Sequence, residues 1–367
     1  MTNEKETFNP RLESVRGIAA LGVAFTHSQI VFNLTSRDYE ALGPLRNWVF
    51  IGLPSGGSVI VFFVLSGYVL RLAIEREQSA FRFIVRRLFR IFPALWVAVT
   101  AMFLALLFVA PQLPKDQFHP AFQSWFLNLP TWNDYWLNLL LLKNNIDQVT
   151  WSLSPELIWS LALPVCAWLH FRANTVWRLV ALLVLAWVGY SSYRSYIQFG
   201  AAFYAGFFVP KEILIPRLTR ATAAAALSVA GWVLLCYGNI TLVAYTPSMR
   251  LWCAASAVLV VSGVSTSGRY MVLLETAPLR FLGRLSYSFY LLHPPTLFCF
   301  AAIAAYWPVI RPINMLGSLS FGCASIILAI AVSAICYRFV ELPFIAIGRR
   351  LVFAQKSSAQ LDETARA

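Results

Sequence analysis

The chain has 367 residues, of which 59% are hydrophobic and 12% are charged. Soluble domains carry about 25% charged and roughly 45–50% apolar residues, so this composition excludes an ordinary water-soluble protein. The net charge of +13 does not indicate nucleic-acid binding, because the basic residues lie at the ends of apolar runs, where they mark membrane topology. The six cysteines form no CxxC pair, and we expect no metal site.

Apolar runs of membrane-spanning length recur along the chain. A spanning helix needs about 20 mostly apolar residues, which predicts roughly ten spans: 12–33, 50–72, 88–110, 151–170, 175–193, 196–210 (short), 221–239, 250–266, 281–305 and 314–340. The first run is too long for a cleavable signal peptide. We therefore predict an all-α integral membrane protein, with a membrane-embedded domain over residues 1–350 and a disordered cytoplasmic tail over 351–367.

The basic residues predict the orientation. With the N-terminus in the cytoplasm, ten spans return the C-terminus to the cytoplasm, and 22 of the 29 basic residues lie on that side. This excess follows the positive-inside rule. The long connection, residues 111–150, then lies outside, where its aromatic residues (Trp125, Trp132, Tyr135 and Trp136) either stack on sugar rings or form an interfacial belt.

The first span carries two ionisable residues, Arg16 and His27. They are eleven residues apart, close to three helical turns, so both project from one face about 16 Å apart. An inner cation suits an anionic ligand, and a deeper imidazole suits a base. The alternative is an arginine that reaches the membrane surface and a histidine bonded to a neighbouring helix. We favour the functional interpretation, because burying a histidine within the membrane costs free energy.

Two further clusters precede spans. Arg86, Arg87 and Arg90 share one helix face, where guanidinium groups suit phosphates, anionic lipid headgroups or simple positive-inside flanking. Glu156 follows Pro155 in an expected first helical turn, with Ser154 as the N-cap. Glu156 either takes part in the function of the protein or only stabilises the start of the helix by its interaction with the helix dipole.

Two polar segments lie near the end of the chain. One span joins several hydroxyl groups to His293 and is broken by two prolines. At the inner end of the last span, Arg338 and Glu341 are spaced for a simple salt bridge.

In these segments the chain resembles the acyltransferase-3 family of membrane O-acyltransferases, which modify surface glycans and related molecules. The resemblance covers roughly residues 9–350. It rests on six motifs in order: Arg16 with His27; Phe62-Phe-Val-Leu-Ser-Gly67; Arg87, Arg90 and Pro93; Trp151 to Glu156; Ser286 to Pro295; and Phe339 to Pro343. The chain departs from the family at Glu13, where Asp is usual, and at Leu157, where a second acidic residue is common. We also expect no esterase-like domain after the last span.

The resemblance implies a membrane acyltransferase in a bacterial inner membrane. Acyl-CoA, expected to be acetyl-CoA, is then a substrate that enters from the cytoplasm, and no cofactor is bound permanently. The acceptor is a hydroxyl of a glycan or lipid-linked saccharide.

Residue roles follow from the same resemblance. His27 is the general base or a transient acyl carrier, Arg16 lines the path, and Glu156 orients His27 or contacts the acceptor. The donor-binding set is Arg86, Arg87, Arg90, Ser66, Tyr287 and His293. Two alternatives remain, a transporter or flippase for an anionic lipid or solute, and a membrane scaffold.

Overall fold

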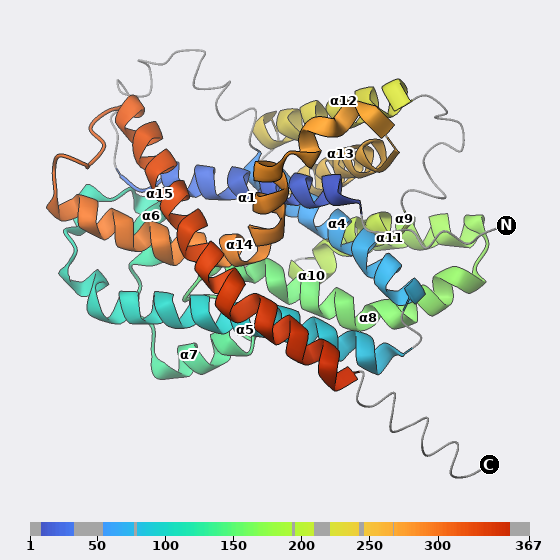
Figure 1. The fold of residues 1–367 in the computed structure, drawn as a ribbon, viewed down its shortest axis with the longest axis horizontal. Helices are drawn as coiled ribbons and strands as arrows, with labels where there is room; N and C mark the ends of the chain where they lie inside the picture. Colours follow the sequence, from blue (N-terminus) through green and yellow to red (C-terminus); the bar gives the residue numbers. More distant parts are fainter. Residues whose placement is uncertain are drawn as a thin grey trace, which may run out of the picture.

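The computed structural model describes residues 9–32, 54–76, 79–192, 195–208, 221–241, 246–266 and 268–352. Figure 1 shows that these residues form a bundle of helices. The α-helices are α1 (Pro10–Gln29), α4 (Ser55–Arg76), α5 (Ala80–Phe108), α6 (Pro120–Phe126), α7 (Trp132–Leu139), α8 (Leu153–Arg172), α9 (Thr175–Ser191), α10 (Ser195–Gln198), α11 (Gly200–Phe208), α12 (Ala221–Thr241), α13 (Pro247–Thr266), α14 (Ala277–Tyr306) and α15 (Met315–Cys336).

Short helical turns join several of these helices. The 3₁₀ turns are η1 (Ala110–Gln112), η2 (Lys115–Gln117), η3 (Gln148–Ser152) and η4 (Gly268–Glu275), and a π-helical turn, η5 (Tyr337–Glu341), continues α15. Beyond η5 the chain stays helical through residue 352. The expected tail at 351–367 therefore lies almost wholly outside the described residues.

The all-helical membrane fold is confirmed. Seven helices among the described residues are long and apolar enough to cross a bilayer, and α9 is a shorter apolar helix. The expected span 196–210 is instead divided into α10 and α11, of four and nine residues. At 1.5 Å per residue, α11 is about 14 Å long and cannot cross a bilayer by itself.

Helix α1 is not among those seven apolar helices, yet it lies inside the bundle, packed on α14, α4 and α15. Its closest approach is to α14, where Gly17 faces Gly283. A Cβ atom added to Gly17 would lie 2.8 Å from the Gly283 backbone nitrogen, so only glycine permits this distance between the two helices. A similar approach joins α4 to α11 through Gly67 and Gly206.

The long connection between α5 and α8 is ordered around α7, which packs beside α5 (Figure 1). The Trp96 indole donates to the Leu139 carbonyl, and the hydroxyls of Thr100 and Tyr135 are hydrogen-bonded. Trp132 and Trp136 are about two-thirds exposed, although the Trp132 ring also contacts Phe103 of α5. This exposure favours the interfacial belt for these two residues.

Two carboxyl groups in this connection have opposite environments. Asp134 forms a capping box with Thr131 and an ion pair with Lys143, and these contacts hold the pKa of Asp134 well below its usual range. Asp147 is fully buried, and neither of its carboxyl oxygens has a hydrogen-bond partner among the described residues. Burial therefore raises the pKa of Asp147 well above its ordinary value.

The glycine contact between α1 and α14 can be tested by substitution. Gly17→Ala should destabilise the protein by about 1–3 kcal/mol, because the methyl group meets backbone atoms that cannot move aside. Thermal unfolding of the purified protein in detergent measures the change. Gly317→Ala is the control, since its nearest neighbours would be 3.3 Å away. Equal midpoints for wild type and Gly17→Ala would contradict the prediction.

The environment of Asp147 predicts a pH dependence. The unfolded carboxyl titrates near pH 4, whereas the folded one titrates higher. Between these values folding takes up a proton, so the contribution of Asp147 to stability falls as pH rises through its folded pKa. Asp147→Asn should therefore stabilise the protein increasingly as pH rises. Asp134→Asn should lower the unfolding midpoint by a constant amount across pH 5–8, because Asp134 is ionised throughout. A pH-independent effect of Asp147→Asn would contradict the argument.

Candidate functional site

Two histidines from opposite ends of the sequence meet between α1 and α14. His27 Nδ1 lies 3.0 Å from His293 Nε2, and the two rings stack with centroids 5.2 Å apart. Each histidine lies ten residues beyond the glycine of its helix, Gly17 or Gly283. The two helices therefore run in the same direction over about 15 Å, and the glycine contact at one end sets the histidine contact at the other.

The hydrogen bonds of the pair determine where its protons lie. His293 Nδ1 is 3.3 Å from the Phe289 carbonyl oxygen, which can only accept, so Nδ1 carries the proton. His293 Nε2 must then accept, and His27 Nδ1 donates to it. This arrangement leaves the lone pair on His27 Nε2, the atom that a general base needs. Trp125 makes a T-shaped contact with the His27 ring, with centroids 5.3 Å apart.

A second group of polar residues joins α5 to α8. Arg87 and Glu156 form an ion pair in which both side chains are about nine-tenths buried. The Ser66 hydroxyl donates to Glu156 at 3.2 Å, and Arg87 Nε donates to Ser160 at 3.2 Å. Ser66 is held here because the neighbouring Gly67 lets α11 pack directly on α4.

Three more charged residues complete this cluster. Arg16, Arg90 and Glu341 interact electrostatically with one another and with the Arg87–Glu156 pair. Glu341 is 2% exposed, lies in the π-helical turn and accepts a hydrogen bond of 2.6 Å from Ser288. Within these described residues three arginines face two carboxylates, a formal excess of one positive charge. A buried excess of this kind favours an anionic ligand.

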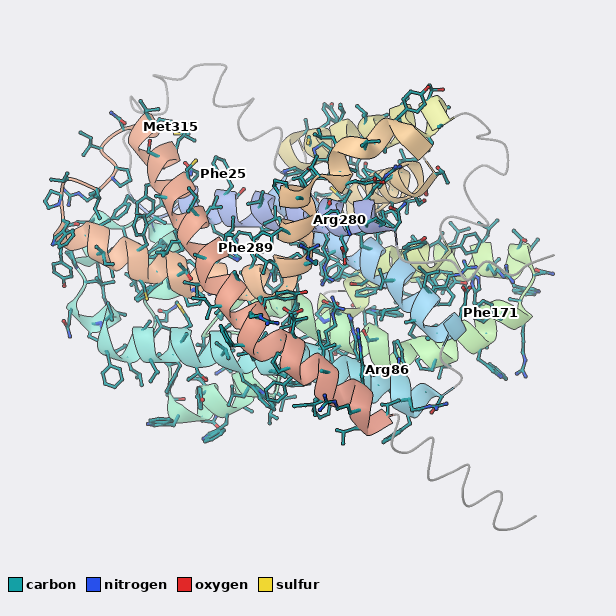
Figure 2. All side chains as sticks on the ribbon, viewed as in Figure 1. Phe25, Arg86, Phe171, Arg280, Phe289 and Met315 are labelled. Atoms are coloured by element: carbon teal, nitrogen blue, oxygen red, sulfur yellow. The ribbon has the colours of Figure 1, made fainter. Side chains whose placement is uncertain are left out.

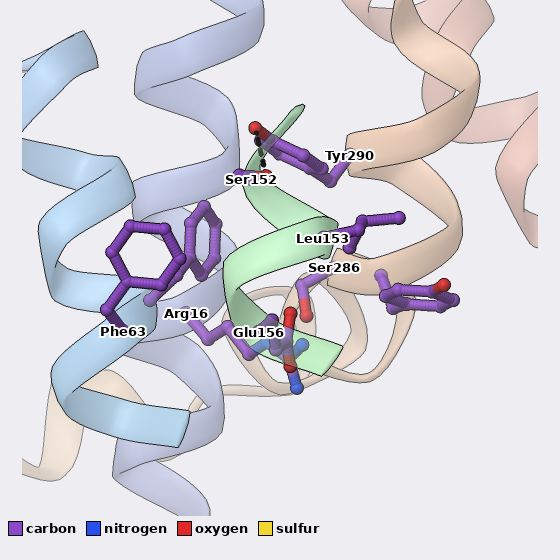
Figure 3. A pocket seen from close by; sticks show the side chains of 9 residues that line it. Arg16, Phe63, Ser152, Leu153, Glu156, Ser286 and Tyr290 are labelled. Atoms are coloured by element: carbon purple, nitrogen blue, oxygen red, sulfur yellow. Dashed lines mark hydrogen bonds between the residues drawn. The ribbon is translucent and has the colours of Figure 1, made fainter. Parts of the chain in front are cut away.

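A small cavity lies beside the charged cluster. Arg16, Glu156 and Ser286 converge on one side of it, and Phe63 and Tyr290 line the other (Figure 3). The Tyr290 and Ser152 hydroxyls are hydrogen-bonded at 3.0 Å. The volume is about 20 Å³, enough for roughly one water molecule. A substrate arm can pass here only if the side chains separate.

Several predicted site residues lie close together in the structure. Arg16, Arg87 and Arg90 share one cluster, and Arg16 and His27 lie on the same helix, as their spacing predicts. Ser66 lies in this cluster through Glu156. Tyr287 lines the cavity, but its hydroxyl donates to the Ile91 carbonyl at 2.7 Å, which ties α14 to α5. Arg86 is exposed.

Other expectations differ from the structure. Glu156 was expected in the first turn of the span that follows the outer connection, and Arg87 just before the cytoplasmic start of another span, yet the two are in contact. The reason is that α5 begins at Ala80, so Arg87 lies two turns inside the helix. Glu156 has no hydrogen bond to His27 in the described structure. His293, expected among the donor-binding residues, contacts His27; its part in donor binding stays a prediction.

Two local expectations are wrong. Ser154 is not the N-cap of α8. That position belongs to Ser152, while the Ser154 hydroxyl bonds to the Leu141 carbonyl. The Arg338–Glu341 salt bridge is absent from the described residues, because the π-helical turn directs Glu341 to Ser288. From the sequence, Trp125 was only one of the aromatic residues of the long connection. Nothing in the sequence predicted its contact with His27.

The chain is similar to known proteins over most of its length. A family profile described as an acyltransferase domain matches residues 9–338, which include both histidines and all three clustered arginines. Nodulation protein 10 of Rhizobium leguminosarum bv. viciae is 30% identical over 173 residues, or 44% of this chain and 46% of that protein. The matched region thus spans less than half the length of this relative. No solved structure matches the chain significantly.

The Arg87–Glu156 pair predicts a non-additive effect on stability. Arg87→Ala and Glu156→Ala should each cost about 3–5 kcal/mol, because each leaves a buried charge without its partner. The double variant should cost clearly less than the sum. Thermal unfolding in detergent measures all three. The Arg11–Glu275 pair supplies the control: its glutamate is 40% exposed, so Glu275→Ala should cost less than about 1 kcal/mol. Additive losses would show that the two charges are not coupled.

Proposed function

Because the chain belongs to the acyltransferase-3 family, we propose that it transfers an acetyl group from acetyl-CoA, delivered from the cytoplasmic side, to a hydroxyl group of a glycan or lipid-linked saccharide. The enzyme class, an acyltransferase in a multi-pass membrane protein, follows from the family and the helices. The donor, the acceptor, a bacterial inner membrane and cytoplasmic termini are parts of the proposal.

The His27–His293 hydrogen bond is the observation that carries the proposal. His27 Nε2 has no proton and faces away from His293, so it can take one from an acceptor hydroxyl. The hydroxyl oxygen then attacks the thioester carbonyl, a C–O bond forms and the C–S bond breaks. The CoA thiolate leaves with the proton that His27 held. His293 accepts the Nδ1 proton of His27 throughout and keeps the ring in the productive tautomer.

The charged cluster supports an anionic donor. Among the described residues, Arg16 and Arg90 form no hydrogen bond or ion pair, and the cluster carries one excess positive charge. The diphosphate of a CoA thioester would satisfy these guanidinium groups. Arg16 and His27 are about 16 Å apart along α1, a separation that the long, narrow pantetheine arm can bridge.

The acceptor is supported by the outer part of the site. Trp125 packs against His27 in a T-shaped contact and remains partly exposed. An indole at this position offers an apolar surface to a sugar ring beside the catalytic base. The similarity to a protein named for nodulation and the resemblance to glycan-modifying enzymes are consistent with a saccharide acceptor.

The histidine pair gives the direct test. His27→Ala should reduce transfer of radiolabelled acetyl from acetyl-CoA by about 10²–10⁴-fold, because the base is lost. His293→Gln should retain much more activity than His293→Leu, because the amide oxygen can still accept from His27 Nδ1. Both His293 variants should alter kcat and the pH–rate profile more than the KM for acetyl-CoA.

Thermal unfolding must first show that these variants are folded. Full transfer by folded His27→Ala would refute the mechanism. Membranes that contain wild-type protein should release free CoA from acetyl-CoA; a transporter or flippase would release none. Equal activity of the two His293 variants would remove His293 from the proton arrangement.

A further inference from the structure

A second, larger pocket lies where α4 and α8 end and α5 begins. Its volume is about 330 Å³, within the range of small-molecule sites. Phe83 and Ala167 form its buried base, and the rings of Trp168 and Phe171 are about half exposed at its walls. Figure 2 shows Phe171 and Arg86 on the same side of the molecule. The pocket is therefore open to a flat aromatic ligand.

A cation lies against one of the residues that line this pocket. The Arg172 guanidinium stacks over the Trp168 ring at 4.1 Å from the ring centroid. Arg172 is exposed and has no carboxylate partner among the residues that the structure describes. The stacked geometry orients the group while its N–H donors stay available. An aromatic pocket beside an exposed guanidinium fits a planar base that carries a phosphate.

The pocket also adjoins the charged cluster. Phe83 lies one helical turn before Arg87 on α5, and Pro164 lies one turn after Ser160 on α8. Arg87 and Ser160 are hydrogen-bonded across the two helices. The pocket and the cluster are thus about 6 Å apart along each helix. One elongated ligand could occupy both.

We propose that this pocket binds the adenosine 3′-phosphate end of the acyl-CoA donor. The adenine stacks against Trp168, Arg172 binds the 3′-phosphate, and the diphosphate extends to Arg87. This assignment rests on the proposed acyl transfer, since it concerns the same donor. The mixed aromatic and cationic walls favour a nucleotide over a lipid acyl chain, which would need no charge.

Binding of CoA itself tests the pocket without any transfer reaction. Trp168→Ala should weaken CoA binding to purified protein in nanodiscs about tenfold, the size of one lost base–aromatic stack. Arg172→Ala should weaken CoA binding but leave dephospho-CoA binding unchanged, because dephospho-CoA lacks the 3′-phosphate. Trp177→Ala is the matched control, since Trp177 is 65% exposed on α9 outside the pocket. Wild-type affinity in both pocket variants would overturn the proposal.

A kinetic comparison separates the pocket from the reaction. Trp168→Ala should raise the KM for acetyl-CoA about tenfold and leave kcat unchanged, while the kinetics with S-acetylpantetheine, which has no nucleotide, stay as in wild type. Ala80→Trp, which fills the pocket from an exposed position, should have the same effect. If wild type binds CoA but transfers no acetyl group, the proposed function fails while the pocket assignment stands.

Two outcomes of the kinetic experiment would overturn the pocket assignment. One is an equal effect of the variants on the kinetics with acetyl-CoA and with S-acetylpantetheine. This result would mean that the pocket residues only maintain the structure of the protein. The other is a wild-type KM that rises to the variant value when anionic lipid is omitted from the nanodiscs, which would mean that the pocket holds a lipid headgroup.

Discussion

The close approach of Gly17 to Gly283 determines the arrangement of the whole site. A side chain at either position would separate α1 from α14, and the two helices would no longer run together to the point where His27 meets His293. The same contact holds Arg16 beside Ser286 at the cavity. One backbone contact therefore positions both the imidazole pair and the inner cation. A bilayer offers little hydrophobic force between helices, so small residues at such crossings are the usual source of close packing.

The second constraint is charge compensation away from water. Three arginines and two glutamates lie together inside the bundle, and each glutamate is hydrogen-bonded by a serine: Glu156 by Ser66 and Glu341 by Ser288. Unpaired charges at this depth would be costly. When no ligand is bound, the two glutamates neutralise two of the three arginine charges. The remaining positive charge attracts an anion. An arriving phosphate must compete with Glu156 for Arg87, so binding and side-chain separation at the small cavity are expected to occur together.

The sequence predicted the helices better than the contacts between them. Long apolar runs identified most helices because length and hydropathy are local properties. The break within 196–210 was missed, since composition alone does not show where a short apolar helix bends or ends. Arg16 and His27 were found because their spacing lies on one helix. The His27–His293 contact joins residues 266 positions apart, and nothing local in either segment specifies the other. The Arg87–Glu156 pair was missed for another reason: the start of α5 was placed too late, so Arg87 was assigned to the membrane edge.

Helix α1 shows why the helix that carries the functional residues is not one of the most hydrophobic helices. A helix that faces lipid must be apolar along most of its surface, and those helices are the easiest to recognise. Helix α1 contacts α14, α4 and α15 instead, so it can carry Arg11, Glu13, Arg16 and His27 without exposing them to hydrocarbon. Helix α1 can have a low hydropathy because it lies in the centre of the bundle. A catalytic group also needs a central position if it is to reach a donor on the inner side and an acceptor on the outer side. In a chain otherwise this apolar, the most polar of the long helices is therefore the first place to look for chemistry.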